Sequence, residues 1–169
     1  NMNIDNWQQN IPSHFPDESS VWIYQSNQFI NVEQKEKIQQ QINAFTSNWL
    51  SHKQSVKGWG TILFNHFIIL IANETLTQVS GCSKDSMMHF IQSLEKEYHI
   101  TLLDRTQLAF FKHNKIEIYT LSSLSKKIEI GEINSNTIYF NNTICNKKQL
   151  LNEWIVEVQH SWIKQKFNC

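Results

Sequence analysis

The chain has 169 residues, of which 40% are hydrophobic and 18% charged, and fifteen basic residues balance fifteen acidic ones. This composition is typical of one globular domain and unlike that of disordered chains. A neutral chain without a polybasic segment lacks the charge that nonspecific binding to nucleic acid or to an anionic membrane requires. We therefore expect neither partner.

The cysteines and histidines point away from a metal or disulfide framework. Cys82, Cys145 and Cys169 are an odd, sparse set without CxxC spacing, and the seven histidines form no HxxxH or HExxH pair. We expect no metal and no cofactor. The polar start lacks the layout of a signal peptide, and the longest apolar run, at 67–72, is too short to span a bilayer. These features predict a cytoplasmic protein.

The first elements follow from prolines, β-branched residues and helical spacing. Residues 1–20 contain both prolines and predict an irregular arm, whose apolar residues pack it against the body. Residues 21–25 predict a strand. Asn31 and Gln34 form the pattern of a capping box, which predicts a helix of about 17 residues after it. The apolar residues of the arm and helix are Trp7, Ile11, Phe15, Ile38, Ile42, Phe45 and Trp49.

Two hairpins and a second helix follow. Residues 59–64 and 67–72 predict strands joined by a two-residue turn at Asn65 and His66, and the second is apolar throughout, as in a central strand. Ser83 is the predicted cap of the second helix. Its buried stripe is expected to be Met87, Ile91, Leu94 and Tyr98. The second predicted hairpin pairs residues 107–112 with 116–121.

The order β-α-β-β-α-β over residues 21–121 is that of the ferredoxin-like fold, in which two helices cover one face of an antiparallel sheet. We therefore predict an α+β protein with one domain at 21–169. Residues 122–169 form its C-terminal extension, with an additional strand at 137–140 and a helix from near Asn146.

Several segments give the chain a resemblance to an uncharacterised family of small proteins from the Bacteroidota, whose members often carry the label ABC transporter ATPase. The segments are 21–27 (VWIYQSN), 63–70 (LFNHFIIL), 80–86 (SGCSKDS), 103–105 (LDR), 140–142 (FNN) and 161–162 (SW). The chain departs from that pattern at His66, where Arg is usual, and at His160, where an acid is usual. The resemblance implies membership and no established activity.

The residues contradict the ATPase label itself. An ABC ATPase needs GxxxxGK[ST], because the backbone amides and the lysine of that loop hold the phosphates. None of the four glycines, Gly58, Gly60, Gly81 and Gly131, begins such a motif. We therefore reject this activity.

One segment, between a strand and a strong helix, predicts a site. Its hydroxyls, thiol and lysine gather where free N–H groups of a helix start point outward. The candidate anion-binding residues are Ser80, Gly81, Cys82, Ser83, Lys84 and Ser86. The simpler interpretation is that Ser83 caps the helix, Gly81 permits the turn and Cys82 is a buried filler.

A third interpretation makes Cys82 a nucleophile or redox sensor, with His66 or His89 as the candidate base. Asp104 and Arg105 predict an exposed ion pair of little energy. We expect a non-catalytic binding or regulatory domain for a small anion or a protein partner, and a homo-oligomer stays open. The alternative is a cysteine-dependent enzyme or redox protein.

Overall fold

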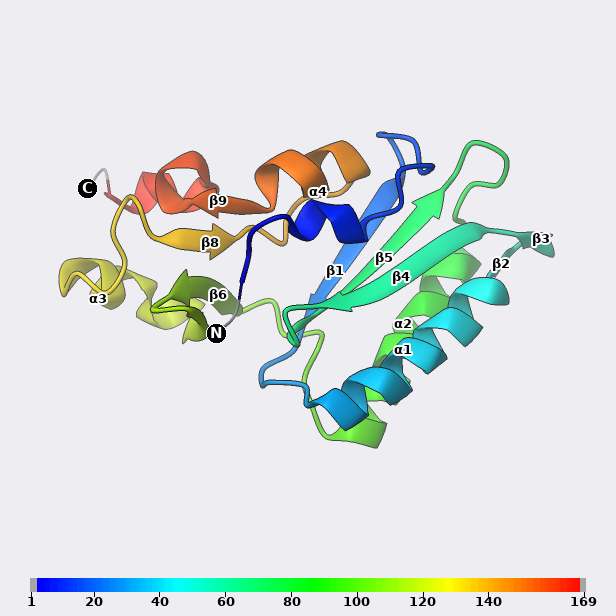
Figure 1. Ribbon diagram of the computed structural model, residues 1–169, viewed down its shortest axis with the longest axis horizontal. Helices are drawn as coiled ribbons and strands as arrows, with labels where there is room; N and C mark the ends of the chain where they lie inside the picture. Colours follow the sequence, from blue (N-terminus) through cyan, green and yellow to red (C-terminus); the bar gives the residue numbers. More distant parts are fainter. Residues whose placement is uncertain (1–2, 168–169) are drawn as a thin grey trace.

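The computed structural model describes residues 3–167 and shows helices combined with antiparallel strands (Figure 1). The N-terminal sheet has the order β1 (Ser20–Gln25), β5 (Phe67–Asn73), β4 (Lys57–Leu63). The C-terminal sheet has the order β7 (Lys115–Thr120), β6 (Gln107–Lys112), β8 (Ile138–Phe140), β9 (Ile155–Glu157). A short ribbon pairs β2 (Leu50–Ser51) with β3 (Gln54–Ser55). The predicted α+β class is confirmed.

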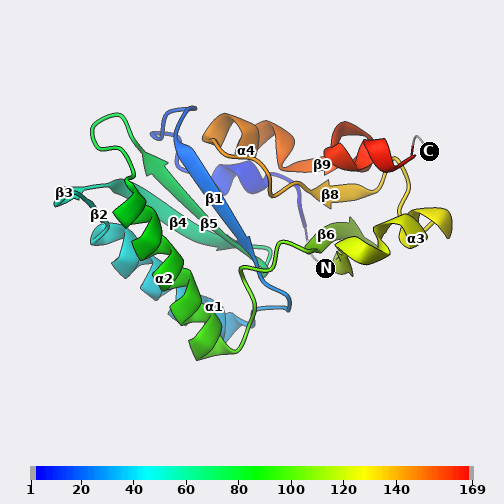
Figure 2. The ribbon, with the colours of Figure 1, turned by 180° about the vertical axis from the view of Figure 1, so that it is seen from behind.

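The α-helices are α1 (Val32–Ser47), α2 (Gly81–Tyr98), α3 (Leu124–Glu129) and α4 (Lys147–Glu153). The long helices α1 and α2 lie together on one face of the N-terminal sheet, and α4 and the C-terminal sheet lie on its other side (Figures 1 and 2). Short 3-10 turns occupy residues 7–10, 121–123, 158–160 and 162–167.

The ferredoxin-like topology is not confirmed, because its fourth strand joins another sheet. The order β1-β5-β4 and the two helices match the first five elements of that fold. However, β6 pairs with β7 and β8 in the other sheet, so it does not pair with β1 as the ferredoxin-like fold requires. The outer edge of β1 is instead taken at its start by the segment before α4: Val21 N–H donates to Cys145 O at 3.0 Å, and Lys147 N–H donates to Ser19 O at 2.9 Å.

Helix α1 begins as the capping box predicts. Gln34 N–H donates to Asn31 Oδ1 at 2.8 Å, and Asn31 N–H donates to Gln34 Oε1 at 3.3 Å. Ile38 and Ile42 are fully buried against the sheet. The helix approaches β4 closely at Gly60, where a Cβ would lie 2.6 Å from Ile42 Cγ2. This close approach requires glycine.

The first hairpin turn is one residue earlier than predicted. The positive φ values fall on Phe64 (54°) and Asn65 (55°), and His66 N–H donates to Leu63 O at 3.2 Å. This is the geometry of a type I′ turn, and positive φ is unusual for a bulky residue. The Phe64 ring packs 5.9 Å from the rings of Phe140 and Trp154, which offsets the strain. In the second hairpin, the turn was expected at residues 113–115, but Lys115 already pairs with Lys112 in the ladder, so the turn consists of His113 and Asn114.

Strand β5 is buried on both faces, as its apolar sequence predicts. Ile68, Leu70 and Ala72 belong to the core shared with α1 and α2. Phe67, Ile69 and Ile71 face the other way, toward a second core. This second core includes Trp154, which has no exposed surface. The cores place the N-terminal sheet at the centre of the protein.

The N-terminal arm packs against the second core. Trp7, Ile11 and Phe15 are buried there, and the Trp7 ring meets that of Trp154 edge to face at 5.0 Å. Lys147, at the start of α4, fixes the arm with hydrogen bonds from its ammonium. The acceptors are the carbonyl oxygens of Pro12 (3.0 Å), Ser13 (3.4 Å) and Phe15 (2.7 Å).

The C-terminal extension contains the elements that the sequence predicts. Strand β8 lies within the expected range 137–140, and Asn146 caps α4 by accepting the Gln149 N–H at 2.9 Å. Trp162 is half-buried against the third core, formed by the C-terminal sheet and α3. Cys169 lies outside the described residues.

Candidate functional site

The predicted anion-binding segment starts α2, but its cap differs from the prediction. Ser80, not Ser83, is the N-cap: its backbone is extended and its Oγ accepts the Ser83 N–H at 3.2 Å. Ser83 lies inside the first turn and is fully buried, and its Oγ donates to Leu50 O at 2.8 Å. Both hydroxyls are therefore used in capping and packing.

The rest of the segment faces solvent. Gly81 is the first helical residue, and a Cβ there would meet nothing within 4 Å, so no turn requires glycine. Cys82 is exposed, and the interpretation as a buried filler was wrong. Ser86 Oγ donates back to Cys82 O at 3.0 Å within the helix. Of these anion-binding candidates, Lys84 lines a hollow in the protein surface.

The two histidines considered as bases are not beside Cys82. His66 precedes β5 and Cys82 follows it, and a strand of seven residues is about 20 Å long. His89 lies on α2 seven residues after Cys82, a rise of about 10 Å along the helix, and it is exposed. The structure therefore brings neither imidazole within hydrogen-bond reach of the thiol.

A hollow beside the outer edge of β1, here called the edge groove, has a volume of about 290 Å³. Its walls come from β1, α2, the link between α2 and β6, and the segment after β8. The lining residues are Ser20, Val21, Trp22, Ile23, Lys84, Arg105, Asn142, Ile144 and Cys145. Residues more than a hundred positions apart in the chain thus meet here.

The edge groove carries two positive charges. Lys84 and Arg105 line it, and within the described part of the chain no acidic residue does. The Arg105 guanidinium lies 3.5 Å from Ile23 O and 5.8 Å from the centre of the Tyr24 ring. These contacts with β1 hold the guanidinium at the groove while leaving most of its donors unused.

The backbone of β1 adds a donor. Along an antiparallel strand, the backbone N–H and C=O of one residue point to one edge, and those of the next residue point to the other edge. Every second residue therefore directs both groups to the same edge. Val21 directs its N–H outward to Cys145, and Ile23 directs its C=O outward to Arg105. The N–H of Ile23 therefore points into the edge groove between these two contacts.

A second hollow, here called the junction pocket, lies between the two sheets and has a volume of about 190 Å³. It shares Arg105 and Asn142 with the edge groove. Its other lining residues are Gln25, Leu102, Asp104, Gln107, Leu108, Tyr139, Phe140, Thr143 and Trp162. A ligand in one hollow would therefore touch the wall of the other.

The junction pocket has a mixed polar lining. Tyr139 is 3% exposed, and its oxygen accepts the Trp162 Nε1–H at 3.1 Å, which leaves its own proton to donate. Burial raises the pKa of Tyr139, so the phenol stays protonated. The hydrogen bonds from Thr106 lower the pKa of Asp104, which remains charged. The negative charge of Asp104 thus balances the positive charge of Arg105 in this pocket, whereas the lining of the edge groove is positive.

The wall between the hollows is fixed by a chain of amides. Trp154 Nε1–H donates to Asn142 Oδ1 at 2.9 Å, and Asn142 Nδ2–H donates to Gln25 Oε1 at 2.9 Å. Gln25 Nε2–H in turn donates to Gln107 O at 3.1 Å, which joins the end of β1 to the start of β6. This network keeps the site preformed.

The sequence interpretation underestimated Asp104 and Arg105. Both residues are exposed, as expected, but among the described residues no salt bridge joins them, and Asp104 Oδ1 accepts hydrogen bonds from Thr106 instead. Arg105 lies at the junction of both hollows. No local pattern revealed this role, because the partners come from β1, α2 and β8.

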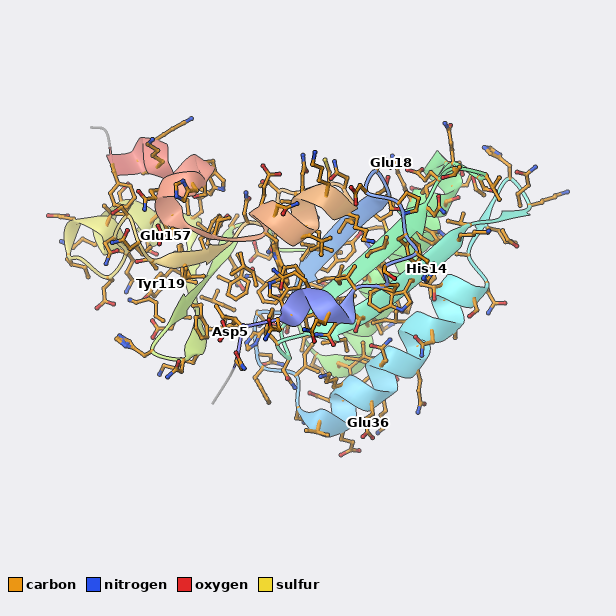
Figure 3. All side chains as sticks on the ribbon, turned by 45° about the horizontal axis from the view of Figure 1, so that its top comes forward. Asp5, His14, Glu18, Glu36, Tyr119 and Glu157 are labelled. Carbon is orange, nitrogen blue, oxygen red and sulfur yellow. The ribbon has the colours of Figure 1, made fainter. Side chains whose placement is uncertain are left out.

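A further polar cluster lies on the C-terminal sheet. Tyr119, labelled in Figure 3, donates to Glu117 Oε2 at 2.6 Å, and Lys112 Nζ contacts both Tyr119 Oη (3.1 Å) and Glu132 Oε2 (2.8 Å). Partial burial and the bond to Glu117 raise the pKa of Tyr119. Lys112 and Glu132 form an ion pair and Glu117 accepts the Tyr119 hydroxyl proton, so these side chains are engaged within the cluster.

Two further findings concern membranes and metals. Within residues 3–167, no helix combines the length and apolar character that a membrane crossing needs. The same residues contain no group of three or more His, Cys, Asp or Glu side chains that could hold a metal ion.

No family model matches the chain, and no curated protein and no solved structure matches it either.

Proposed function

We propose that the chain is a non-catalytic binding domain that holds a small anion, a carboxylate or a phosphate, in the edge groove. The observation that carries this proposal is the pairing of Lys84 and Arg105 in one hollow whose described lining has no acid. Because both cations line the same hollow, an anion bound there would be attracted by both charges.

The donors suit an anion in geometry as well as in charge. A guanidinium binds two oxygens of a carboxylate or phosphate side by side, and an ammonium adds a point charge. The Ile23 N–H supplies a fixed backbone donor of the kind that holds anions in many sites. The amide chain through Asn142 fixes the wall, which lowers the entropy lost on binding.

This site modifies the anion-binding hypothesis drawn from residues 80–86. Lys84 keeps its proposed role, whereas Ser80 and Ser83 serve the helix start. The cysteine-dependent alternative is weaker, because a nucleophilic thiol needs a base within reach and neither His66 nor His89 is placed there. Cys82 and Cys145 are free and exposed, which suits a reducing cytoplasm.

The fold gives the proposal an architectural reason. We propose that β1, α1, β4, β5 and α2 form a ferredoxin-like unit without its fourth strand, and that the edge groove occupies part of the vacated position beside β1. The resemblance to the family of the Bacteroidota supports a site in the same region, at the edge groove and the junction pocket. Five of its six segments, 21–27, 80–86, 103–105, 140–142 and 161–162, contribute lining residues to the two hollows.

Backbone NMR of the ¹⁵N-labelled protein tests this function, with inorganic phosphate and acetate as separate probes at constant ionic strength. We expect saturable shifts of the Ile23 amide and of the Arg105 Nε signal. The stronger probe identifies the anion class. Shifts that grow linearly without saturation, or that spread over all exposed lysines, would show screening by salt and exclude the site.

A further inference from the structure

A separate hollow, here called the turn pocket, lies where both hairpin turns meet the link between β1 and α1. Its volume is about 490 Å³, within the range of roughly 300–1,000 Å³ of small-molecule sites. Phe29, Phe64, His66 and Ile116 form most of its wall. It shares no lining residue with the edge groove or the junction pocket.

The walls of the turn pocket are held in place. Asn65 Nδ2–H donates to Ile30 O at 2.7 Å, and Ile30 N–H donates to Asn65 O at 2.8 Å. This reciprocal pair clamps the first hairpin turn to the residue after Phe29. Phe64 is fixed at a positive φ, an unusual conformation that persists where the surroundings impose it. The pocket is therefore preformed.

Its aromatic surface is open to a ligand. Phe29 is 62% exposed, and exposure of its apolar ring to water is energetically unfavourable. The ring meets the His66 ring edge to face, with the centroids 5.9 Å apart. His66 Nδ1 lies 3.1 Å from Phe64 O, and burial lowers the pKa of the imidazole. At neutral pH His66 is therefore an uncharged aromatic wall.

The charge at the rim selects the ligand. Lys115 is exposed and lines the pocket beside Asn114, and within the described residues the lining has no carboxylate. An ammonium next to an aromatic wall suits a flat ring that carries one acidic group. A neutral ring would gain no attraction from the Lys115 ammonium, and a cationic ring would be repelled by it.

We propose that the turn pocket binds an aromatic carboxylate, with the ring against Phe29, Phe64, His66 and Ile116 and the carboxylate at Lys115. This site is independent of the anion site at Arg105. It would make the protein a binder of two ligands at two separate sites.

Isothermal titration calorimetry with 1-naphthoate and its neutral isostere 1-naphthamide tests the proposal. We expect naphthoate to bind about threefold to fivefold tighter than naphthamide, the worth of an exposed charge pair. Lys115→Gln should abolish this difference. Phe29→Ala should weaken both ligands by about threefold to tenfold, since it removes one aromatic contact. Both side chains are exposed, so the variants should fold.

Controls separate this site from other surfaces. Lys53→Gln and Leu76→Ala remove an exposed charge and an exposed apolar side chain elsewhere, and should leave both affinities unchanged. Arg105→Gln should also leave naphthoate binding unchanged. The proposal is overturned if the wild-type protein does not bind naphthoate, if Phe29→Ala and Lys115→Gln bind it like wild type, or if Arg105→Gln abolishes binding.

Discussion

Substitution of Gly60 tests how closely α1 packs on the N-terminal sheet. A Cβ at this position would lie 2.6 Å from Ile42 Cγ2, 2.6 Å from Leu70 Cδ2 and 3.1 Å from Ile69 O. Ile42 and Leu70 are both fully buried, so neither side chain has space to retreat. We expect Gly60→Ala to force α1 outward and to destabilise the protein by about 2–3 kcal/mol, the upper part of the range for overpacked cores.

Gly81→Ala is the matched control, because it adds the same methyl where nothing lies within 4 Å. Alanine favours the helix that begins at this residue, and we expect a gain of about 0.5 kcal/mol in the free energy of unfolding. Urea unfolding followed by tryptophan fluorescence measures both variants. If Gly60→Ala is as stable as wild type, α1 does not approach β4 as described, and the packing argument fails.

Three further predictions concern single side chains. Lys147→Met should lower the free energy of unfolding by about 2–4 kcal/mol, because three carbonyl oxygens of the arm, the buried one of Phe15 among them, lose a charged donor. Lys148→Met at an exposed position should change it by less than about 0.5 kcal/mol, and equal urea midpoints would contradict this. Burial holds the pKa of His66 below its ordinary value of 6.5, so the unfolded chain binds the proton first and stability should fall as pH drops through that value. His66→Gln should reduce the loss of stability between pH 7.5 and 5.5, and an unchanged loss would refute the assignment. Cys82→Ser should leave phosphate and acetate binding unchanged by calorimetry, and loss of binding would favour the thiol alternative.

Local signals in the sequence predicted the elements well. The capping pattern at Asn31 and Gln34 involves neighbours three residues apart, and its hydrogen bonds form as expected. The β-branched and aromatic composition predicted β1, β5 and β6 within one or two residues. The first turn was placed one residue late, because Phe64 is a poor residue for positive φ and its position depends on distant partners, Phe140 and Trp154.

Non-local pairing could not be derived in the same way. The order of elements up to residue 121 fits one sheet, but β6 has a competing partner in β8, which lies far along the chain. Arg105 illustrates the same limit for the site. Its sequence neighbours suggest a solvated loop, and its importance follows only when the segment after β8 folds back beside β1.

Calorimetric titration of wild-type, Arg105→Gln and Lys84→Gln protein with the anion that shifts the Ile23 amide tests the central claim most directly. Each variant should bind about tenfold or more weakly, since a charge-assisted hydrogen bond contributes about 1.5–3 kcal/mol, and Lys148→Gln should bind like wild type. Wild-type affinity in both variants, or equal weakening in Lys148→Gln, would contradict an anion site in the edge groove.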